Sequence, residues 1–363
     1  MRDEWETTTA WRSLLCCTAS LLIAALFHPL MAAYALAFII VLRATRLPRR
    51  RLYWTLLLFA ALALAALLQF LAATESPAII AAERSRYYWF LSQWQWFELL
   101  GLVGPLIILA LLLRRYRNRP SPPDQTAATL CYACIAAGIL AILVVLVFAH
   151  EDAPKHLVAR MQPLRIFLPI YAVMTLLLGA TLMQQAMDAR QRFHSPITRR
   201  ILAALPALTL VALAATMFMV QRLAYPSSFH TELPWLAERS PNPWVQVFLW
   251  ARDNTPSDAL FALDAKYVNE DGEDAQTFRA IALRSALPDF SKDGGEAAIT
   301  PQLAAIWQPA ATAQVNLSTE PSALRDANLA PFNPTWMILH STATTTHPCP
   351  YNNGTIKVCS LIP

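Results

Sequence analysis

The amino-acid sequence concentrates charge in one stretch near its carboxyl-terminal end, FRAIALRSALPDFSKDGG, within a chain of 363 residues that is otherwise mostly apolar. The charged residues of this stretch are Arg279, Arg284, Asp289, Lys292 and Asp293. Arginine offers paired planar donors that suit phosphate or carboxylate, and the glycines of SKDGG can expose backbone N–H groups to an anion. The stretch therefore predicts a pocket for a phosphate or an anionic sugar. The alternative is that the arginines pair with Asp264, Asp289 or Asp293 and hold a loop in place.

A second candidate combines Glu98 with Arg165, near the ends of two apolar runs. Glu98 follows the aromatic stretch YYWFLSQWQWF and is expected about one turn inside a membrane helix, where an unpaired carboxylate is unfavourable. Arg165, in QPLRIFL, is expected at the matching end of another helix and could neutralise it. We therefore predict a groove for a lipid-linked phosphate, with Arg165 as the phosphate contact and Glu98 as its orienter or a candidate base. An aromatic belt with snorkelling charged side chains is the alternative.

Other residues that could do chemistry have simpler explanations. His28 precedes Pro29 in LFHPLM, and its ring can bond a carbonyl group that the proline leaves free. Cys131 and Cys134 form a CYAC motif, but no histidine or acidic residue accompanies them in the apolar run, so we expect packing. CYAC matches a metal or redox spacing, but phosphate-binding GxxxxGK[ST] loops, other zinc-ligand spacings and GxSxG nucleophile elbows do not occur in the sequence. We therefore expect neither a metal nor a cofactor.

The elements that must position these residues are membrane helices. The composition is 56% apolar and only 15% charged, which is rare among soluble proteins. The apolar residues concentrate in runs near the length of about 20 residues that crosses a bilayer. Six spans are predicted, at residues 14–42, 52–72, 94–113, 127–148, 164–182 and 201–220. The predicted fold is an α-helical polytopic membrane domain, residues 1–220, followed by a small extracytoplasmic α/β domain, residues 221–363.

The first of these runs is too long for one straight helix, and Pro29 removes a backbone donor near its middle. We predict one kinked helix rather than two spans, because each half would have only about 13 or 14 residues against the usual 17 or more. The amino-terminal residues MRDEWETTTAW lack the features of a cleavable signal peptide.

Arginine-rich loops set the predicted orientation. RATRLPRRR, RRYRNR and DARQRFHSPITRR are alternate loops, and short basic loops stay in the cytoplasm. Six spans then place both termini outside. From residue 221 onward, nine Lys and Arg residues stand against fourteen Asp and Glu residues, so the tail is acidic. The net charge of +5 thus reflects loops that face anionic lipid, and it indicates no nucleic-acid partner.

The acidic tail carries the signals of a small layered domain. Helices are predicted at residues 243–253, 273–283, 301–307 and 322–328, and strands at 258–265, 285–289, 335–339 and 355–361. Cys349 and Cys359 flank PYNNGTIKV, in which Asn353-Gly354 is a strong hairpin signal. A three-residue loop, 353–355, would bring the cysteines opposite each other, and an oxidising exterior would let them form a disulfide. Two half-buried thiols are the alternative.

Two stretches of the tail, WARDNTPSDALFAL and FRAIALRSALPDFSKDGG, resemble the external segment of a group of bacterial integral membrane proteins, which in turn resemble the GT-C superfamily of glycosyltransferases. ERSRYYWFLSQWQWFELLGLVGPL and RMQPLRIFL extend the resemblance. The resemblance implies a protein of cell-envelope glycan metabolism in the bacterial inner membrane, with its tail in the periplasm. It implies membrane lipid and a polyprenyl-phosphate sugar as partners, and the binding or transfer of that sugar.

The chain departs from the GT-C pattern in one respect. GT-C enzymes have more helices than six, and their acidic catalytic motif lies in the first external loop, whereas only Asp3, Glu4 and Glu6 precede the first predicted span. This departure leaves three interpretations open: the carboxyl-terminal half of a larger assembly, a split product, or a subunit without its own catalytic acid. The chain is then either a GT-C-like glycosyltransferase or an accessory half of one, which a partner membrane subunit completes. The alternative is a non-catalytic membrane anchor that presents its α/β domain to another protein.

Overall fold

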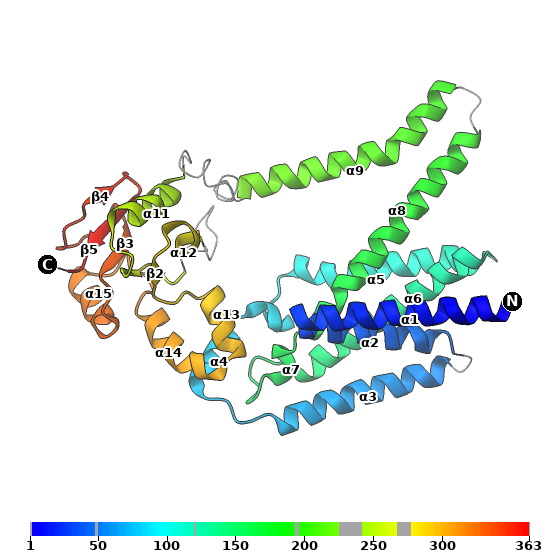
Figure 1. Ribbon diagram of the computed structural model, residues 1–363, viewed down its shortest axis with the longest axis horizontal. Helices are drawn as coiled ribbons and strands as arrows, with labels where there is room; N and C mark the ends of the chain where they lie inside the picture. Colours follow the sequence, from blue (N-terminus) through cyan, green and yellow to red (C-terminus); the bar gives the residue numbers. More distant parts are fainter. Residues whose placement is uncertain are drawn as a thin grey trace. The chain divides into compact units, whose positions relative to one another are not determined.

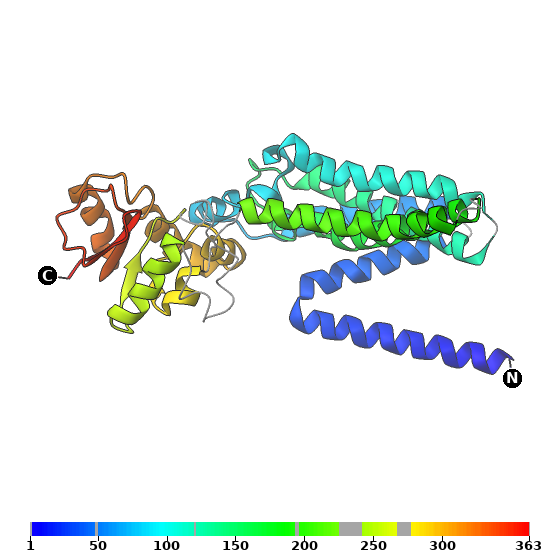
Figure 2. The same cartoon turned by 90° about the horizontal axis from the view of Figure 1, so that it is seen from above.

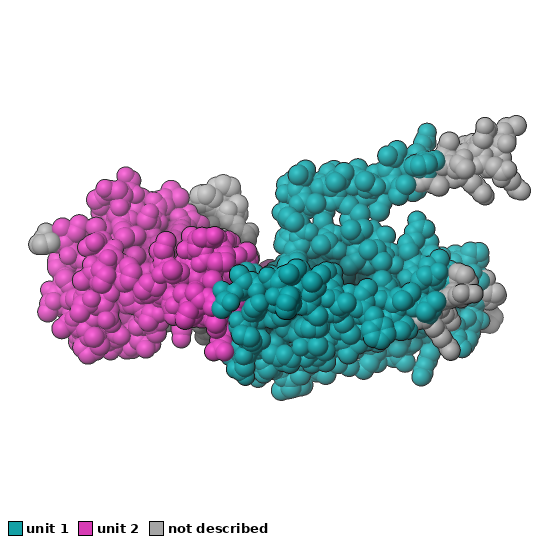
Figure 3. Space-filling model, turned by 90° about the horizontal axis from the view of Figure 1, so that it is seen from below, with its two compact units in different colours: residues 1–74, 87–206 teal, residues 75–86, 207–363 magenta. Residues whose placement is uncertain are grey.

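The computed structural model describes residues 2–47, 50–119, 121–192, 196–224, 242–266 and 277–362. The chain forms two compact units (Figure 3). The first contains residues 1–74 and 87–206, and the second contains residues 75–86 and 207–363. Residues 75–86 thus belong to the same unit as the tail, although they lie between membrane helices in the sequence. The predicted domain boundary between residues 220 and 221 stays a prediction.

The first unit is a bundle of apolar helices with α6 at its centre (Figure 1). The neighbours that pack on α6, Pro122–Phe148, are α2, Pro29–Thr45, α3, Arg50–Leu71, α5, Trp96–Arg117, and α8, Phe167–Arg192. Small residues of α6 allow close approach, since a side chain at Gly138 would come within 2.7 Å of Leu106. The end of the bundle at which α3 ends and α5 begins also carries four short elements: η1, Tyr87–Trp89, η2, Leu91–Gln93, α7, Leu157–Arg160, and η3, Pro163–Ile166.

These helices confirm a multi-pass membrane protein. Four described stretches are long and apolar enough to cross a bilayer: Leu52–Leu71, Trp96–Arg117, Pro122–Phe148 and Leu157–Asp188. Three shorter apolar helices accompany them: Trp11–Phe27, Pro29–Thr45 and Ala207–Val220. The last of these belongs to α9, Pro196–Ala224. Contact with membrane lipid follows from the apolar surfaces of these helices.

The prediction of one kinked first span was wrong. α1, Arg2–Phe27, ends before His28, and α2 begins at Pro29. His28 has φ −153° and ψ 85°, outside the helical region, so the helix breaks completely. The chain reverses there, and α1 and α2 meet at the break and diverge from it (Figure 2). Each helix is longer than the corresponding half of the apolar run 14–42, because α1 begins at Arg2 and α2 ends at Thr45.

The reversal changes which helix ends lie together. α1 begins at the end of the bundle where α2 and α5 end and where α3 and α6 begin (Figure 1). This end carries the arginines of the basic connections, including Arg46 and Arg117, whereas Arg49 lies outside the described residues. The prediction that the amino terminus lies at the end opposite the basic loops therefore does not fit the structure.

The second unit confirms the predicted small α/β domain. Its sheet has the strand order β2-β1-β3-β5-β4. The strands are β1, Leu260–Ala262, β2, Ser285–Ala286, β3, Trp336–His340, β4, Tyr351–Asn352, and β5, Ile356–Ser360. β1 runs parallel to β2 and β3, whereas β5 runs antiparallel between β3 and β4.

Both faces of this sheet are covered, because side chains alternate along each strand. Ile338 on β3 packs with Phe248 and Phe278 from the helices of one face, whereas Met337 and Leu339 pack on the other face.

The helices of the unit are α4, Pro77–Arg84, α11, Pro243–Asn254, α12, Thr277–Ala282, α13, Lys292–Ile299, α14, Pro301–Thr312, α15, Ser322–Leu329, and the 3-10 turn η6, Ala330–Phe332. α4 packs against α13 and α14, so a segment from between two spans completes the tail domain.

Local signals placed most tail elements correctly. Asn242 caps α11 by accepting a hydrogen bond from the Trp244 N–H at 2.8 Å, and the predicted strands 335–339 and 355–361 correspond to β3 and β5, which pair with each other. The hairpin register is one residue away from the predicted one, since Asn352 faces Lys357. The predicted helix start at Glu273 lies outside the described residues. SKDGG, predicted as a turn, instead begins α13.

Candidate functional site

The charged stretch of the tail is held together by its own residues. Arg279 donates to both carboxylate oxygens of Asp293, at 3.0 and 2.7 Å, and to the carbonyl groups of Ala286 and Leu287. The ion pair joins α12 to the start of α13, and the bonds to the two carbonyl groups join α12 to the end of β2. The contacts match the loop-holding alternative, and the binding of an anionic sugar by Arg279 stays a prediction.

Asp289 serves as a helix cap rather than as an open acid. It is only 4% exposed, and its Oδ1 accepts from the N–H groups of Lys292 at 2.7 Å and of Asp293 at 3.2 Å. Burial, together with the negative charge of Asp293, raises the pKa of Asp289 above its usual range. Lys292 itself is exposed. The predicted anion nest does not form, because the N–H groups of Gly294 and Gly295 donate to the carbonyl groups of Asp289 and Ser291.

Arg284 has different partners from Arg279. Its guanidinium donates to the carbonyl groups of Arg252 and Thr255, the latter at 2.6 Å, and to the Thr255 hydroxyl at 3.1 Å. It therefore satisfies carbonyl groups at the carboxyl end of α11, which a helix leaves without internal partners. The structure does not bring the two guanidinium groups onto a shared position.

A small cavity lies beside this stretch, at the carboxyl ends of β1 and β2. Its lining includes Asp264, Arg279 and Asp289. Its volume of about 10 Å³ suits a single water molecule. The parallel strands of an α/β sheet commonly present ligands at this edge, but this cavity is too small for a sugar.

Glu98 lies in the first turn of α5 and completes a capping box. Its Oε2 accepts from the Gln95 N–H at 2.7 Å, and its Oε1 accepts from the Tyr87 hydroxyl at 3.4 Å. The helix start, rather than Arg165, therefore supplies its partners. Both oxygens have acceptor roles in the local fold.

The Arg165 guanidinium is oriented by one hydrogen bond, from its Nε atom, and its Nη1 atom lies close to another side chain. Its Nε donates to the Gln162 side-chain carbonyl at 2.6 Å, and its Nη1 lies 3.4 Å from the His28 Nε2. In the part of the chain that the structure describes, no carboxylate pairs with this guanidinium. Arg165 is thus a half-buried cation at the end of the bundle opposite the basic connections, and no carboxylate of the described ranges neutralises it.

The turn that carries Arg165 is built to hold one conformation. Gln162 adopts a left-handed backbone, φ 51° and ψ 60°, which is uncommon for a residue other than glycine. The Tyr34 hydroxyl from α2 donates to the carbonyl group of Met161, next to it. Backbone strain of this kind persists only where the surroundings fix it, and such strain is concentrated at functional sites.

An apolar groove extends from this turn along α2 and α6. It consists of two adjoining cavities of about 240 and 120 Å³, both lined by Val41 and Leu140. The smaller one reaches Tyr34 and Pro163, beside Arg165, and the larger one reaches Trp54 on α3. Cavities of this size and lining suit hydrocarbon.

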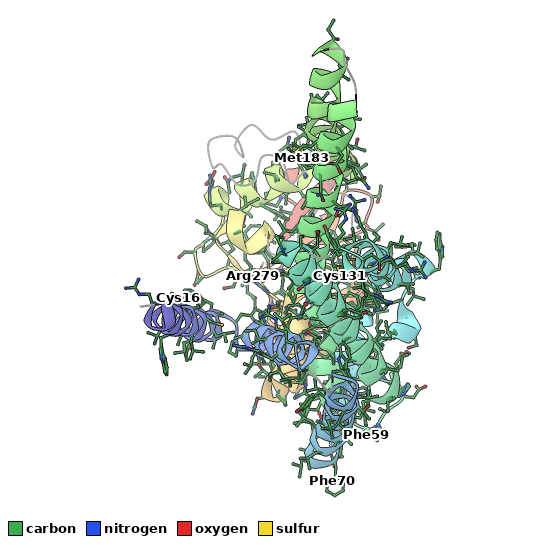
Figure 4. All side chains as sticks on the ribbon, turned by 90° about the vertical axis from the view of Figure 1, so that its right-hand side faces the viewer. Cys16, Phe59, Phe70, Cys131, Met183 and Arg279 are labelled. Carbon is green, nitrogen blue, oxygen red and sulfur yellow. A yellow bond between two sulfur atoms is a disulfide. The ribbon has the colours of Figure 1, made fainter. Side chains whose placement is uncertain are left out.

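The cysteines fall into two groups. Cys349 and Cys359 form a disulfide that ties the loop before β4 to β5. Cys131 and Cys134 of the CYAC motif are fully buried within α6, whereas Cys16 on α1 is exposed (Figure 4). Tight packing around the CYAC pair agrees with the prediction of packing residues.

The sequence did not indicate the contacts or backbone conformation of three residues that the structure makes notable. His28 was interpreted only as a partner for a backbone carbonyl, although it approaches Arg165. Gln162 precedes a proline, and that position gave no sign of a left-handed backbone. Arg86 is buried and donates to the carbonyl groups of Phe290 and Ser291, which attaches α4 to the tail. The role of Arg86 becomes evident only from its burial in the structure.

No protein-family profile, curated protein or solved structure matches the chain. The resemblance to GT-C enzymes therefore rests on the sequence stretches alone.

Proposed function

We propose that this protein binds a lipid-linked phosphate of the polyprenyl-phosphate type, in cell-envelope glycan metabolism, at the end of the bundle where Arg165 lies. The observation that carries the proposal is a guanidinium oriented by Gln162 but without a carboxylate partner among the described residues. A phosphate provides the charged, paired acceptors that arginine prefers.

The groove beside Arg165 supports a lipid rather than a soluble phosphate. Its cavities are lined mainly by apolar side chains of α2, α3 and α6, and it begins at Tyr34 and Pro163. A phosphate at Arg165 would therefore have an apolar channel next to it for a prenyl chain. This combination of one cation and an adjacent hydrocarbon surface supports an amphiphilic ligand.

We also propose that the tail lies in the periplasm of a bacterial inner membrane. α4 connects the membrane helices α3 and α5 and belongs to the compact unit of the tail, so the two lie on one side. The Cys349–Cys359 disulfide favours an oxidising compartment. The arginine-rich connections favour the cytoplasm for the opposite end of the bundle.

Reporter fusions test this orientation. A periplasmic reporter at residue 363 should be active, and a cytoplasmic reporter at residue 1 should be active, because α1 and α2 are separate helices. A cytoplasmic residue 363 would overturn the proposed side of the tail. A periplasmic residue 1 would show that α1 and α2 together cross the membrane only once.

Binding can be measured on the full chain in mild detergent. Native mass spectrometry with a short-chain polyprenyl phosphate should give saturable binding, and the matching polyprenol should bind much more weakly. Arg165→Ala should weaken phosphate binding by about tenfold or more, because a hydrogen bond to a charged group contributes about 1.5–3 kcal/mol.

The matched control is Arg119→Ala. Arg119 lies at the basic end of the bundle and donates to Gln184 at 3.3 Å, so its removal should leave binding unchanged. Equal binding of polyprenol and polyprenyl phosphate, or equal losses in both variants, would count against a phosphate site at Arg165.

A non-catalytic anchor, or an accessory subunit completed by a partner membrane protein, is the second candidate function. It is favoured by the engagement of Glu98 in the capping box of α5, since sugar transfer needs a carboxylate that can activate the acceptor. Wild-type protein that fails to bind polyprenyl phosphate would favour this function. Loss of sugar transfer in Glu98→Gln, with lipid binding intact, would instead favour the enzyme.

A further inference from the structure

The break between α1 and α2 places an imidazole directly against the guanidinium of Arg165. The Nδ1 atom of His28 accepts the cap hydrogen bond from the Met31 N–H at 3.4 Å. The Nε2 atom lies 3.4 Å from the Nη1 of Arg165. His28 is the residue before the Pro29 that begins α2, so the break itself fixes the position of its ring.

These two contacts are incompatible with one neutral imidazole. A neutral histidine has one nitrogen that donates and one that accepts. If Nδ1 accepts from Met31, then Nε2 carries the hydrogen, and every nitrogen of arginine is a donor. Two N–H donors then face each other, an arrangement that leaves both without an acceptor.

We infer that His28 Nε2–H and the Arg165 guanidinium donate to the same phosphate oxygen. This inference rests on the proposed function, and it assigns a second binding residue to that site. The Nε of Arg165 is already bound to Gln162, which leaves the Nη groups for the ligand. The shared acceptor removes the donor conflict and preserves the cap of α2.

An anion fits this position better than a neutral acceptor. The guanidinium has no carboxylate partner among the described residues, so its charge is not neutralised within the chain. Hydrogen bonds between charged donors and phosphate oxygens are about twice as strong as neutral ones. The apolar groove that begins at Tyr34 and Pro163 then favours a phosphate that carries a hydrocarbon chain.

The histidine tautomer gives a direct test. Full-length protein labelled with ¹⁵N-histidine should show His28 protonated at Nε2, and its Nε2 signal should shift when short-chain polyprenyl phosphate is added. His28→Asn identifies the signal by its disappearance. Protonation at Nδ1, with Nε2 accepting from Arg165, would mean that the two side chains simply bind each other, and it would overturn the inference.

Binding measurements give the second test. His28→Asn keeps a good helix-capping side chain, because asparagine is a preferred N-cap, but it removes the Nε2 donor. We expect it to weaken polyprenyl-phosphate binding about fivefold to tenfold, in line with the loss of one hydrogen bond of about 1 kcal/mol or slightly more. His150→Asn, at the end of α6, is the matched control and should bind as the wild type does.

Three ligands separate the possible sources of the phosphate. Sensitivity to His28→Asn that is confined to polyprenyl phosphate supports a phosphate on a prenyl chain. The same sensitivity with phosphatidylglycerol vesicles, or with inorganic phosphate, supports the shared phosphate oxygen but shifts its source to a phospholipid or to free phosphate. Unchanged binding in all three overturns the inference. If His28→Asn binds normally while Arg165→Ala does not, only the role of His28 fails, whereas normal binding by both removes the proposed function as well.

Discussion

The arginines of the two units contrast in how they are used. In the tail unit, Arg279 pairs with Asp293, Arg284 closes the end of α11, and Arg325 is fully buried against three backbone carbonyl groups. In the helical unit, Arg165 is oriented by Gln162 and approached by His28, but no described carboxylate neutralises it. The contrast teaches that the dense cluster of charge stabilises the scaffold here, whereas a cation that no described carboxylate neutralises, beside an apolar groove, marks the candidate site.

The largest expected effect that tests this contrast is a loss of tail stability when Arg325 is substituted. Its guanidinium donates to the carbonyl groups of Leu317, Glu320 and Thr344, and burial lowers its pKa. Arg325→Ala would leave these groups unpaired, so we expect a loss of about 3 kcal/mol in tail stability. Hydrogen exchange of tail amides in the full-length protein measures this loss.

Arg252→Ala is the matched control for that experiment. Arg252 pairs with the exposed Asp253 beside it, and an ion pair of this kind contributes about 1 kcal/mol or less. If the two substitutions lowered tail stability equally, the conclusion that buried arginines stabilise the tail unit would be wrong.

The second prediction concerns Arg86, which attaches α4 to the tail. A methyl group at Gly294 would lie 2.9 Å from the Arg86 guanidinium and 3.0 Å from Trp307. Gly294→Ala should therefore destabilise the tail unit by about 1–2 kcal/mol. Gly295→Ala leaves 3.6 Å to Arg86 and should be neutral or slightly stabilising, since alanine favours a helix. Increased protease cleavage within residues 75–86 in Gly294→Ala alone is the expected readout.

The third prediction compares Arg279 with Arg165 directly. Arg279→Ala breaks a partly exposed ion pair, so it should lower tail stability by about 1 kcal/mol without changing polyprenyl-phosphate binding. Thermal unfolding and native mass spectrometry of the same sample measure both quantities. A tenfold loss of binding in Arg279→Ala would restore the anion pocket that the sequence predicts in the tail.

The smallest expected effect is a pH dependence at Asp289. Burial and the charge of Asp293 raise its folded-state pKa, so the folded protein retains the proton above the ordinary value of about 4. The stability contributed by this group is present at low pH and is lost as pH rises from the unfolded pKa through the raised folded pKa. Asp289→Asn keeps a capping oxygen and should flatten the dependence, with a change below about 1 kcal/mol. An unchanged pH profile would assign the slope to other groups.

The sequence predicted most of the scaffold because its signals are local. Asn242 at the start of α11, and the apolar alternation of β3 and β5, depend on adjacent residues. The helix break at His28 was missed because proline alone does not distinguish a kink from a reversal. The partners of Arg279, Arg284 and Glu98 were open alternatives in the sequence, since which donor reaches which acceptor depends on tertiary packing. The approach of His28 to Arg165 joins residues 137 positions apart, which no spacing rule predicts.

The presence of α4 in the tail unit has a consequence for biogenesis. During synthesis, residues 75–86 emerge long before the ribosome has made the strands and helices that they contact, and domains generally fold as units once their parts are available. The fold of the tail unit therefore cannot be completed until the chain has been synthesised as far as its last strand, β5. A correctly folded tail unit thus requires that residues 75–86 and the later tail segments reach the same side of the membrane.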